Sequence, residues 1–130
     1  MSKKIACLVV SHGDIASRFV AASAKIAGKC DDVHYLAEKD YSPSKLREEL
    51  MTMLHSELSS DGLFIFVSLK GGSYWNCAMR LAKEFPGKVT VFSGLNLSML
   101  LSFITKKHKY SFVELAEVII SDAIRGITKS

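Results

Sequence analysis

The feature of this sequence that most constrains its fold is a strand-length apolar run, residues 4–10, which ends directly before Ser11-His12-Gly13. Apolar runs without polar alternation are typical of strands that are covered on both faces, as in a parallel sheet. Open sheets of this kind bind ligands at the carboxyl ends of their strands. The run therefore predicts an α/β protein in which His12 lies at the edge of the sheet that carries the chemistry.

The rest of the chain alternates between strand-like and helix-like segments. The predicted strands are residues 4–10, 33–37, 63–69 and 88–92, and the predicted helices are 15–28, 73–84, 97–105, 111–126 and one that starts at Ser42-Pro43. Apolar stripes at helical spacing are predicted to face the core, namely Ile15, Phe19, Ala22 and Ile26 in the first helix and Leu46, Leu50, Leu54 and Leu58 in the second. This order predicts one domain, residues 1–130, with three α/β/α layers around a mainly parallel four-stranded sheet.

Composition argues against several classes of function. The net charge is +4 and the basic residues are scattered apart from residues 106–109, whereas nucleic-acid binders concentrate them on one face, so we expect no nucleic-acid partner. No apolar run approaches the ~20 residues that a membrane span needs, and the run near the N-terminus is too short for a signal peptide. Cys7, Cys30 and Cys77 lack metal-like spacing and are expected to be buried thiols, which favours a cytoplasmic location.

His12 is the first candidate for chemistry. A neutral imidazole near pH 7 can act as a nucleophile and accept a phosphoryl group on a ring nitrogen. Gly13 lets the backbone pass close to the ring, and the helix predicted from residue 15 points its free N–H groups toward the same edge, which favours an anion there. The alternative is a loop histidine that only hydrogen-bonds its own backbone.

A second loop, Gly71-Gly72-Ser73, separates a predicted buried strand from a helix start. Two glycines allow consecutive N–H groups to converge on an anion, and Ser73 adds a hydroxyl. The alternative is a tight strand-to-helix turn, which also favours glycine. The other histidines, His34, His55 and His108, lie in surface-type segments without paired ligands and are expected to have no function in the site.

Several separated motifs, in the right order, resemble the enzyme IIA domain of the mannose/fructose family of the bacterial phosphoenolpyruvate-dependent sugar phosphotransferase system. The resemblance covers nearly the whole chain. The motifs are Ser11-His12-Gly13 after the first strand, the proline-led second helix, Gly71-Gly72-Ser73 with Asn76, the segment Ser-Gly-Leu-Asn-Leu-Ser-Met-Leu at residues 93–100, and the serine-led last helix that ends at Gly126.

The resemblance implies a cytoplasmic homodimer with strand order 2-1-3-4, which would place His12 and the Gly71-Gly72 loop across from each other. It also implies that His12 takes a phosphoryl group from the phosphocarrier HPr and passes it to an enzyme IIB. No IIB domain is apparent in the sequence, so we expect the IIB partner to be a separate protein and the membrane permease to be met only indirectly. In the family the reaction needs no metal, and we expect no cofactor. Gly13, Gly71, Gly72 and Ser73 would bind the phosphate.

The chain departs from the family at the third-strand loop. The family usually has Asp-x-x-Gly-Gly-Ser-Pro, in which the aspartate holds the active histidine by its other nitrogen; here Ser68 replaces the aspartate and Tyr74 the proline. We expect Ser68 to orient the ring by accepting a hydrogen bond without charge. Lys70 either attracts phosphate or is solvated, Asp14 is either a first-turn helix residue or a substitute carboxylate, and Asn96 is expected nearby on the third loop.

Two other functions stay open on the sequence. The loss of the aspartate allows a IIA-like regulatory or binding protein with impaired phosphotransfer. The glycine loop also allows a flavodoxin-like module that binds a nucleotide or flavin, although the chain has neither GxGxxG nor a P-loop lysine motif.

Overall fold

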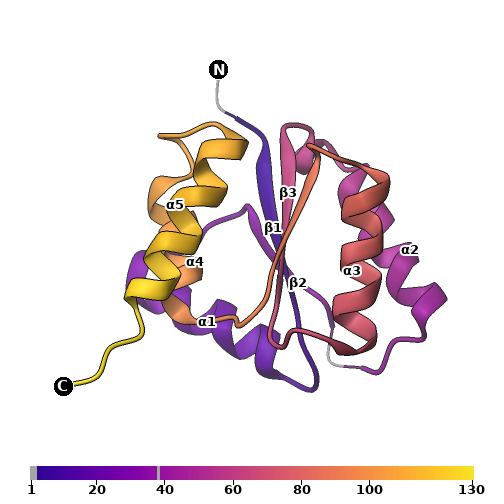
Figure 1. Ribbon diagram of the computed structural model, residues 1–130, viewed down its shortest axis with the longest axis horizontal. Helices are drawn as coiled ribbons and strands as arrows, with labels where there is room; N and C mark the ends of the chain where they lie inside the picture. Colours follow the sequence, from indigo (N-terminus) through magenta and orange to yellow (C-terminus); the bar gives the residue numbers. More distant parts are fainter. Residues whose placement is uncertain (1–2, 38) are drawn as a thin grey trace.

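A computed structural model describes residues 3–37 and 39–130 of the chain. Its elements are β1 (Ile5–Val10), α1 (Ile15–Ala27), β2 (Val33–Tyr35), α2 (Pro43–Leu54), the short 3-10 helix η1 (Glu57–Ser59), β3 (Gly62–Val67), α3 (Gly72–Glu84), β4 (Val89–Phe92), α4 (Leu97–Lys106) and α5 (Phe112–Arg125). The four strands are parallel and lie in the order β2-β1-β3-β4 (Figure 1). The predicted element order, fold class and strand order are confirmed.

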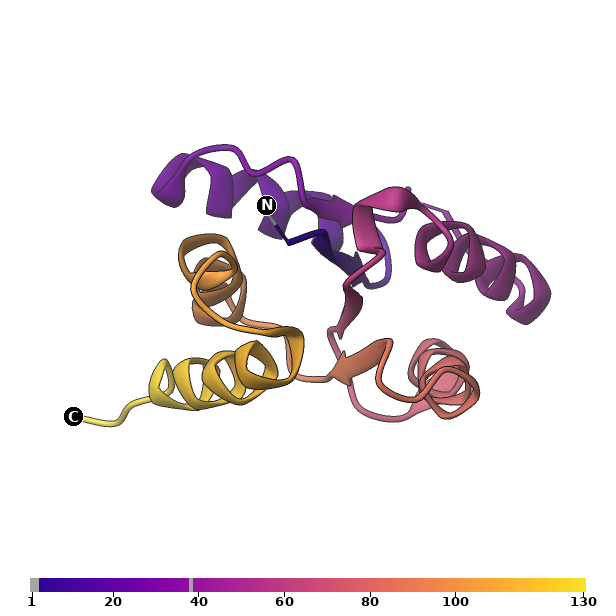
Figure 2. The same ribbon diagram turned by 90° about the horizontal axis from the view of Figure 1, so that it is seen from above.

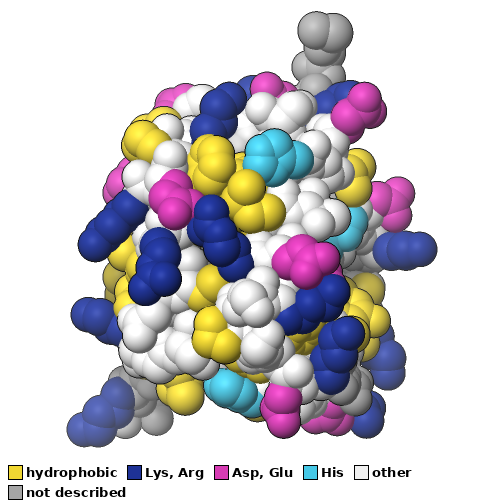
Figure 3. Space-filling model, turned by 90° about the vertical axis from the view of Figure 1, so that its right-hand side faces the viewer, with side chains coloured by type: hydrophobic (Ala, Val, Ile, Leu, Met, Phe, Trp, Pro, Cys, Tyr) yellow, Lys and Arg dark blue, Asp and Glu magenta, His cyan; other side chains and the backbone are white. Residues whose placement is uncertain are grey.

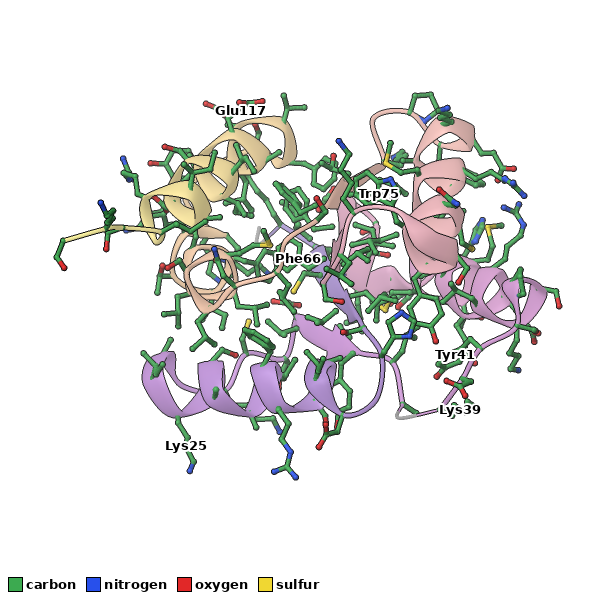
Figure 4. All side chains as sticks on the ribbon, turned by 60° about the horizontal axis from the view of Figure 1, so that its bottom comes forward. Lys25, Lys39, Tyr41, Phe66, Trp75 and Glu117 are labelled. Atoms are coloured by element: carbon green, nitrogen blue, oxygen red, sulfur yellow. The ribbon has the colours of Figure 1, made fainter. Side chains whose placement is uncertain are left out.

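Helices cover both faces of the sheet, as the unbroken apolar strands require. Seen from above, α1, α4 and α5 lie on one side and α2 and α3 on the other (Figure 2). Alternate residues of β1 enter the two cores: Cys7 and Val9 pack with α4 and α5, whereas Leu8 and Val10 pack with α2 and α3. Phe66 of β3 belongs to the first core and Trp75 of α3 borders the second (Figure 4).

The strand order brings two distant loops together. In the register of β1 with β3, Val10 is the partner of Val67, so both strands end at the same level. The N–H of Ser68 donates to the carbonyl oxygen of Val10 at 3.4 Å, and the N–H of Leu95 donates to Val67 at 3.4 Å. The connection after β1 runs to β2 on one side of the sheet, and the connection after β3 runs to β4 on the other. The carboxyl ends of β1 and β3 therefore lie at the switch point at which α/β sheets bind ligands.

The helix starts follow the sequence signals. Ser42 accepts a hydrogen bond from the N–H of Lys45, with Pro43 at the first helical position. Ser111 and Glu114 form the predicted capping box at the start of α5. No helix among the described residues combines the length and the apolar character that crossing a bilayer requires.

Several expectations about element ends and faces are wrong. The second strand, predicted as residues 33–37, ends at Tyr35. The helix that begins at Pro43 does not extend to Leu58, because Ser56 caps the separate turn η1 and leaves Leu58 44% exposed. The third strand stops at Val67, and Leu69 is exposed in the loop that follows.

The buried face of α1 also differs from the prediction. Ala16 and Ser23 are the buried residues, whereas Ile15 and Ile26, which were expected in the core, are 43% and 62% exposed. Phe19 packs against the core as predicted, together with Val20, while the fully buried positions carry small side chains where α1 contacts β2 and α4. The face of α1 predicted from its large apolar residues is therefore rotated by about one residue from the face that is buried.

Candidate functional site

His12 lies exposed just beyond the end of β1, three residues before Ile15, the first residue of α1. Its imidazole stacks on the ring of Tyr74, with the two ring centroids 4.4 Å apart and the planes inclined by 14°. Tyr74 comes from the first turn of α3 and is only 6% exposed. One face of the histidine ring is thus held against a buried side chain, and neither ring nitrogen has a hydrogen-bond partner among the described residues.

Ser68 does not hold the histidine. Its Oγ accepts a hydrogen bond of 2.8 Å from the hydroxyl of Ser11, which precedes His12 on the other loop. The expected hydrogen bond from the imidazole N–H to Ser68 is not formed: the Ser68 hydroxyl bonds Ser11, and the His12 ring stacks on Tyr74. The serine pair instead joins the two loops that follow β1 and β3.

The glycine loop adjoins this pair. Gly71 has φ 88° and ψ 171°, a conformation that side-chain-bearing residues avoid, and Gly72, the first residue of α3, has φ 82°. Gly71 has no side chain with which to cap the helix, so the first N–H groups of α3 have no side-chain cap. Exposed N–H groups at the positive end of a helix are suited to an oxyanion, and Ser73 is exposed beside them.

The remaining predicted residues lie around this centre with different roles. Lys70 is exposed and has no ion-pair partner in the described part of the chain. Asp14 pairs with Arg18 at 3.1 Å, so its carboxylate is engaged along α1 and does not take the place of the family's aspartate. Asn96 caps α4 through the N–H of Met99 at 2.8 Å and donates to the carbonyl oxygen of Ala123 at 3.0 Å, which gives it a structural role.

A groove of about 350 Å³ between α2 and α3 begins at the glycine loop. Ser73 and Asn76 of α3 belong to its lining, together with two guanidinium groups and no carboxylate. Arg47 pairs with Glu84 at 2.8 Å, and Arg80 has no ion-pair partner within the described ranges. The side of the molecule that carries α2 shows many lysine and arginine side chains with fewer acidic ones between them (Figure 3). The surroundings of the site are therefore suited to negatively charged groups.

Neither metal ligation nor thiol chemistry is indicated in the described ranges. No group of three or more histidine, cysteine or acidic side chains there could hold a metal ion. Burial raises the pKa of all three thiols, most strongly that of Cys7, which keeps them protonated and poor nucleophiles. The imidazole of His12 is therefore the nucleophile that the geometry offers.

Sequence reasoning noted Tyr74 only as a replacement and gave Ser11 no role. The signal that was present for Tyr74 is an aromatic residue two positions after the Gly71-Gly72 pair, but its stacking partner is far away in the sequence. Ser11 carried no signal beyond its place beside His12.

Comparison with known proteins identifies the family of the chain. The model of the family described as "PTS system fructose IIA component" matches residues 6–120. No curated protein matches the sequence significantly.

Among solved structures, the phosphotransferase system component EIIA from Streptococcus agalactiae is 25% identical, with a TM-score of 0.84 and 96% of each chain covered. The mannose/sorbose specific IIA subunit from Enterococcus faecalis is 22% identical, with a TM-score of 0.81 over 98% of this chain and 96% of that one. The PTS IIA protein associated with the fucose utilization operon of Streptococcus pneumoniae is 21% identical, with a TM-score of 0.82 over 98% and 94%. Because the family model matches residues 6–120, most of this chain, the chain belongs to the fructose/mannose family of phosphotransferase-system IIA components.

Proposed function

We propose that this protein is a phosphocarrier that accepts a phosphoryl group on His12 from phosphorylated HPr and passes it to a separate enzyme IIB for sugar uptake. The observation that carries the proposal is the placement of an exposed imidazole beside the uncapped start of α3, in a chain of the IIA family. Residues 1–130 would form one such domain, in the cytoplasm.

The transfer follows from the groups at this edge. The lone pair of a neutral ring nitrogen of His12 attacks phosphorus, the phosphorus–nitrogen bond to the HPr histidine breaks, and the departing imidazole takes up a proton. Negative charge on the phosphoryl oxygens is stabilised by the N–H groups of Gly72 and Ser73 and by the N-terminal end of α3. Gly13 and Gly71 keep both loops free of side chains that would block the approach.

A homodimer is part of the proposal. Helix α5 carries Val113, Ile120 and Ile124 on its outer side, 71%, 37% and 62% exposed, and a second copy would cover these apolar side chains. Sedimentation equilibrium of the wild type and of Ile124→Glu would test this part, with dissociation expected for the variant.

The second candidate function is a regulatory IIA-like protein with impaired transfer. It is favoured by the serine at position 68, which carries no charge and bonds Ser11, so that no carboxylate there holds a ring nitrogen of His12. This candidate shares the fold and the family and differs only in the rate of phosphorylation.

The deciding experiment is incubation with phosphoenolpyruvate, enzyme I and HPr, followed by intact mass and mapping of the acid-labile label. We expect one phosphoryl group on His12, its complete loss in His12→Ala, and no loss in His55→Ala. His55 is a matched control because it is also exposed but bonds the carbonyl oxygen of Met51 at 2.9 Å on α2. A folded wild type that takes no label would move the conclusion to the regulatory candidate.

A further inference from the structure

The contact between His12 and Tyr74 is the only ring contact of a histidine at the carboxyl edge of the sheet among the described residues. The rings are nearly parallel, at 14°, so the contact is made face to face. A phosphoryl group joins an imidazole in the plane of the ring, at a nitrogen. Stacking therefore occupies a face that the reaction does not use and leaves both nitrogens accessible.

Tyr74 is itself firmly placed. Its side chain is 6% exposed and belongs to the core between the sheet and the helices α2 and α3, together with Val10, Val67 and Ala78. It is the third residue of α3, directly after Gly72-Ser73. The ring that supports His12 is thus fixed to the same helix turn whose N–H groups would bind the phosphoryl oxygens.

We propose that Tyr74 is a positioning residue that holds the imidazole of His12 toward the start of α3, a task that a hydrogen-bonded carboxylate would otherwise perform. This inference rests on the proposed function, because it assumes that His12 accepts phosphoryl groups. A carboxylate fixes a ring through one nitrogen and adds charge, whereas the tyrosine fixes the ring through its face and adds none. Ser68 is consequently released to join the two loops through Ser11.

Phosphoramidate is a suitable probe because it phosphorylates histidine without a protein partner. Its phosphorus–nitrogen bond breaks, the electron pair leaves with ammonia, the new bond forms to the lone pair of a ring nitrogen, and the proton of the other ring nitrogen goes to solvent. We expect Tyr74→Leu to be phosphorylated about tenfold more slowly than the wild type and Tyr74→Phe at nearly the wild-type rate. Phe85→Leu is the matched control, since Phe85 contacts His55 edge-on at 6.0 Å, away from the site.

Proton NMR gives a readout that a purely structural role would not move. The ring protons of His12 lie over the face of Tyr74, so its ring current should shift them upfield in the wild type and in Tyr74→Phe. In Tyr74→Leu they should return downfield, while the ring protons of His55 stay unchanged. If Tyr74→Leu does not fold, Tyr74→Met takes its place.

Three outcomes separate the two proposals. Equal rates for wild type and Tyr74→Leu, or unchanged His12 resonances, would overturn the role of Tyr74. A tyrosine-dependent rate with phosphoramidate but no label from phosphorylated HPr would leave the positioning role standing and overturn the proposed function. Tyrosine-dependent rates with both donors would support both.

Discussion

In the contact between α4 and α5, Asp122 accepts a hydrogen bond from Ser102 at 2.7 Å and pairs with Lys106 at 2.6 Å and with Arg125. At the carboxyl edge of the sheet, by contrast, the nitrogens of His12 and the ammonium of Lys70 have no such partners in the described part of the chain. In the first region these charged and polar side chains are paired with one another within the fold. The second leaves donors and a nucleophile available, which is what a site for a charged ligand requires.

The opposite end of the sheet resembles the paired region. Lys107, only 2% exposed, pairs with Asp32, whose backbone carbonyl oxygen also accepts the N–H of Cys7. A buried charge without a partner is strongly destabilising, so such pairs are expected wherever no ligand is to be bound. The comparison therefore predicts that changes at the carboxyl edge alter phosphotransfer, whereas changes in the paired regions alter stability alone.

Among changes that keep His12, the largest effect is expected from Gly71→Ala. At φ 88° and ψ 171° an alanine is strained, so the loop should shift and the first N–H groups of α3 should turn away from the phosphoryl group. Loss of such donors costs about a hundredfold in rate in comparable sites. The measurement is the initial rate of labelling by phosphorylated HPr, together with urea unfolding.

Gly87→Ala is the matched control for this change. Gly87 also has a positive φ, 80°, and a Cβ at either glycine would meet no atom within 4 Å, so both variants carry backbone strain without a clash. Both should lose about 1–3 kcal/mol of stability. Only Gly71→Ala should lose transfer, and an equal loss in both would break the comparison between the two kinds of region.

Asp122 gives the next effect, on stability as a function of pH. Hydrogen bonds from Lys106 and Ser102 lower the pKa of this carboxyl from 3.8 to about 2. A lowered folded-state pKa stabilises the protein above about pH 4, and that contribution is lost as the pH falls from about 4 toward 2. We expect about 1 kcal/mol, since part of the carboxylate is screened by solvent.

Unfolding by urea between pH 2 and 5, for the wild type and Asp122→Asn, would measure this contribution. The difference in unfolding free energy should be present at pH 5 and shrink toward pH 2, with labelling of His12 unchanged in the variant at neutral pH. A difference that stays constant over this range would show that the charge of Asp122 contributes nothing.

How well the sequence predicts a structural feature depends on how far apart along the chain the interacting residues are. The capping box at Ser111 is formed by residues three apart, and strand burial is visible in unbroken apolar runs, so both were predicted correctly. The inward face of α1 was not, because it depends on how closely the helix approaches other elements. Within the candidate site, local motifs in the sequence singled out His12 and the glycine loop as candidates, and the fold brings them to the same edge of the sheet.

The contacts between the loops could not be predicted in the same way. The stack of His12 on Tyr74 and the hydrogen bond from Ser11 to Ser68 each join a residue of the loop after β1 to a residue that follows β3, brought together by the register of the two strands. Sequence reasoning expected Ser68 to turn toward His12 because it occupies the position of the family's aspartate. It did not foresee that Ser11, beside the same histidine, donates its hydroxyl to Ser68.

The smallest effect is expected from Ser68→Asp, which restores the carboxylate of the family. The new carboxylate should accept the hydroxyl of Ser11 in place of Ser68 Oγ, while His12 stays stacked on Tyr74. We therefore expect the labelling rate to change by no more than about twofold. Ser68→Asn, similar in shape and without charge, should give the same rate if charge at this position is immaterial. A rise of about tenfold or more for aspartate alone would mean that the site is a weakened form of the family's, and that the tyrosine stack does not substitute for the missing charge.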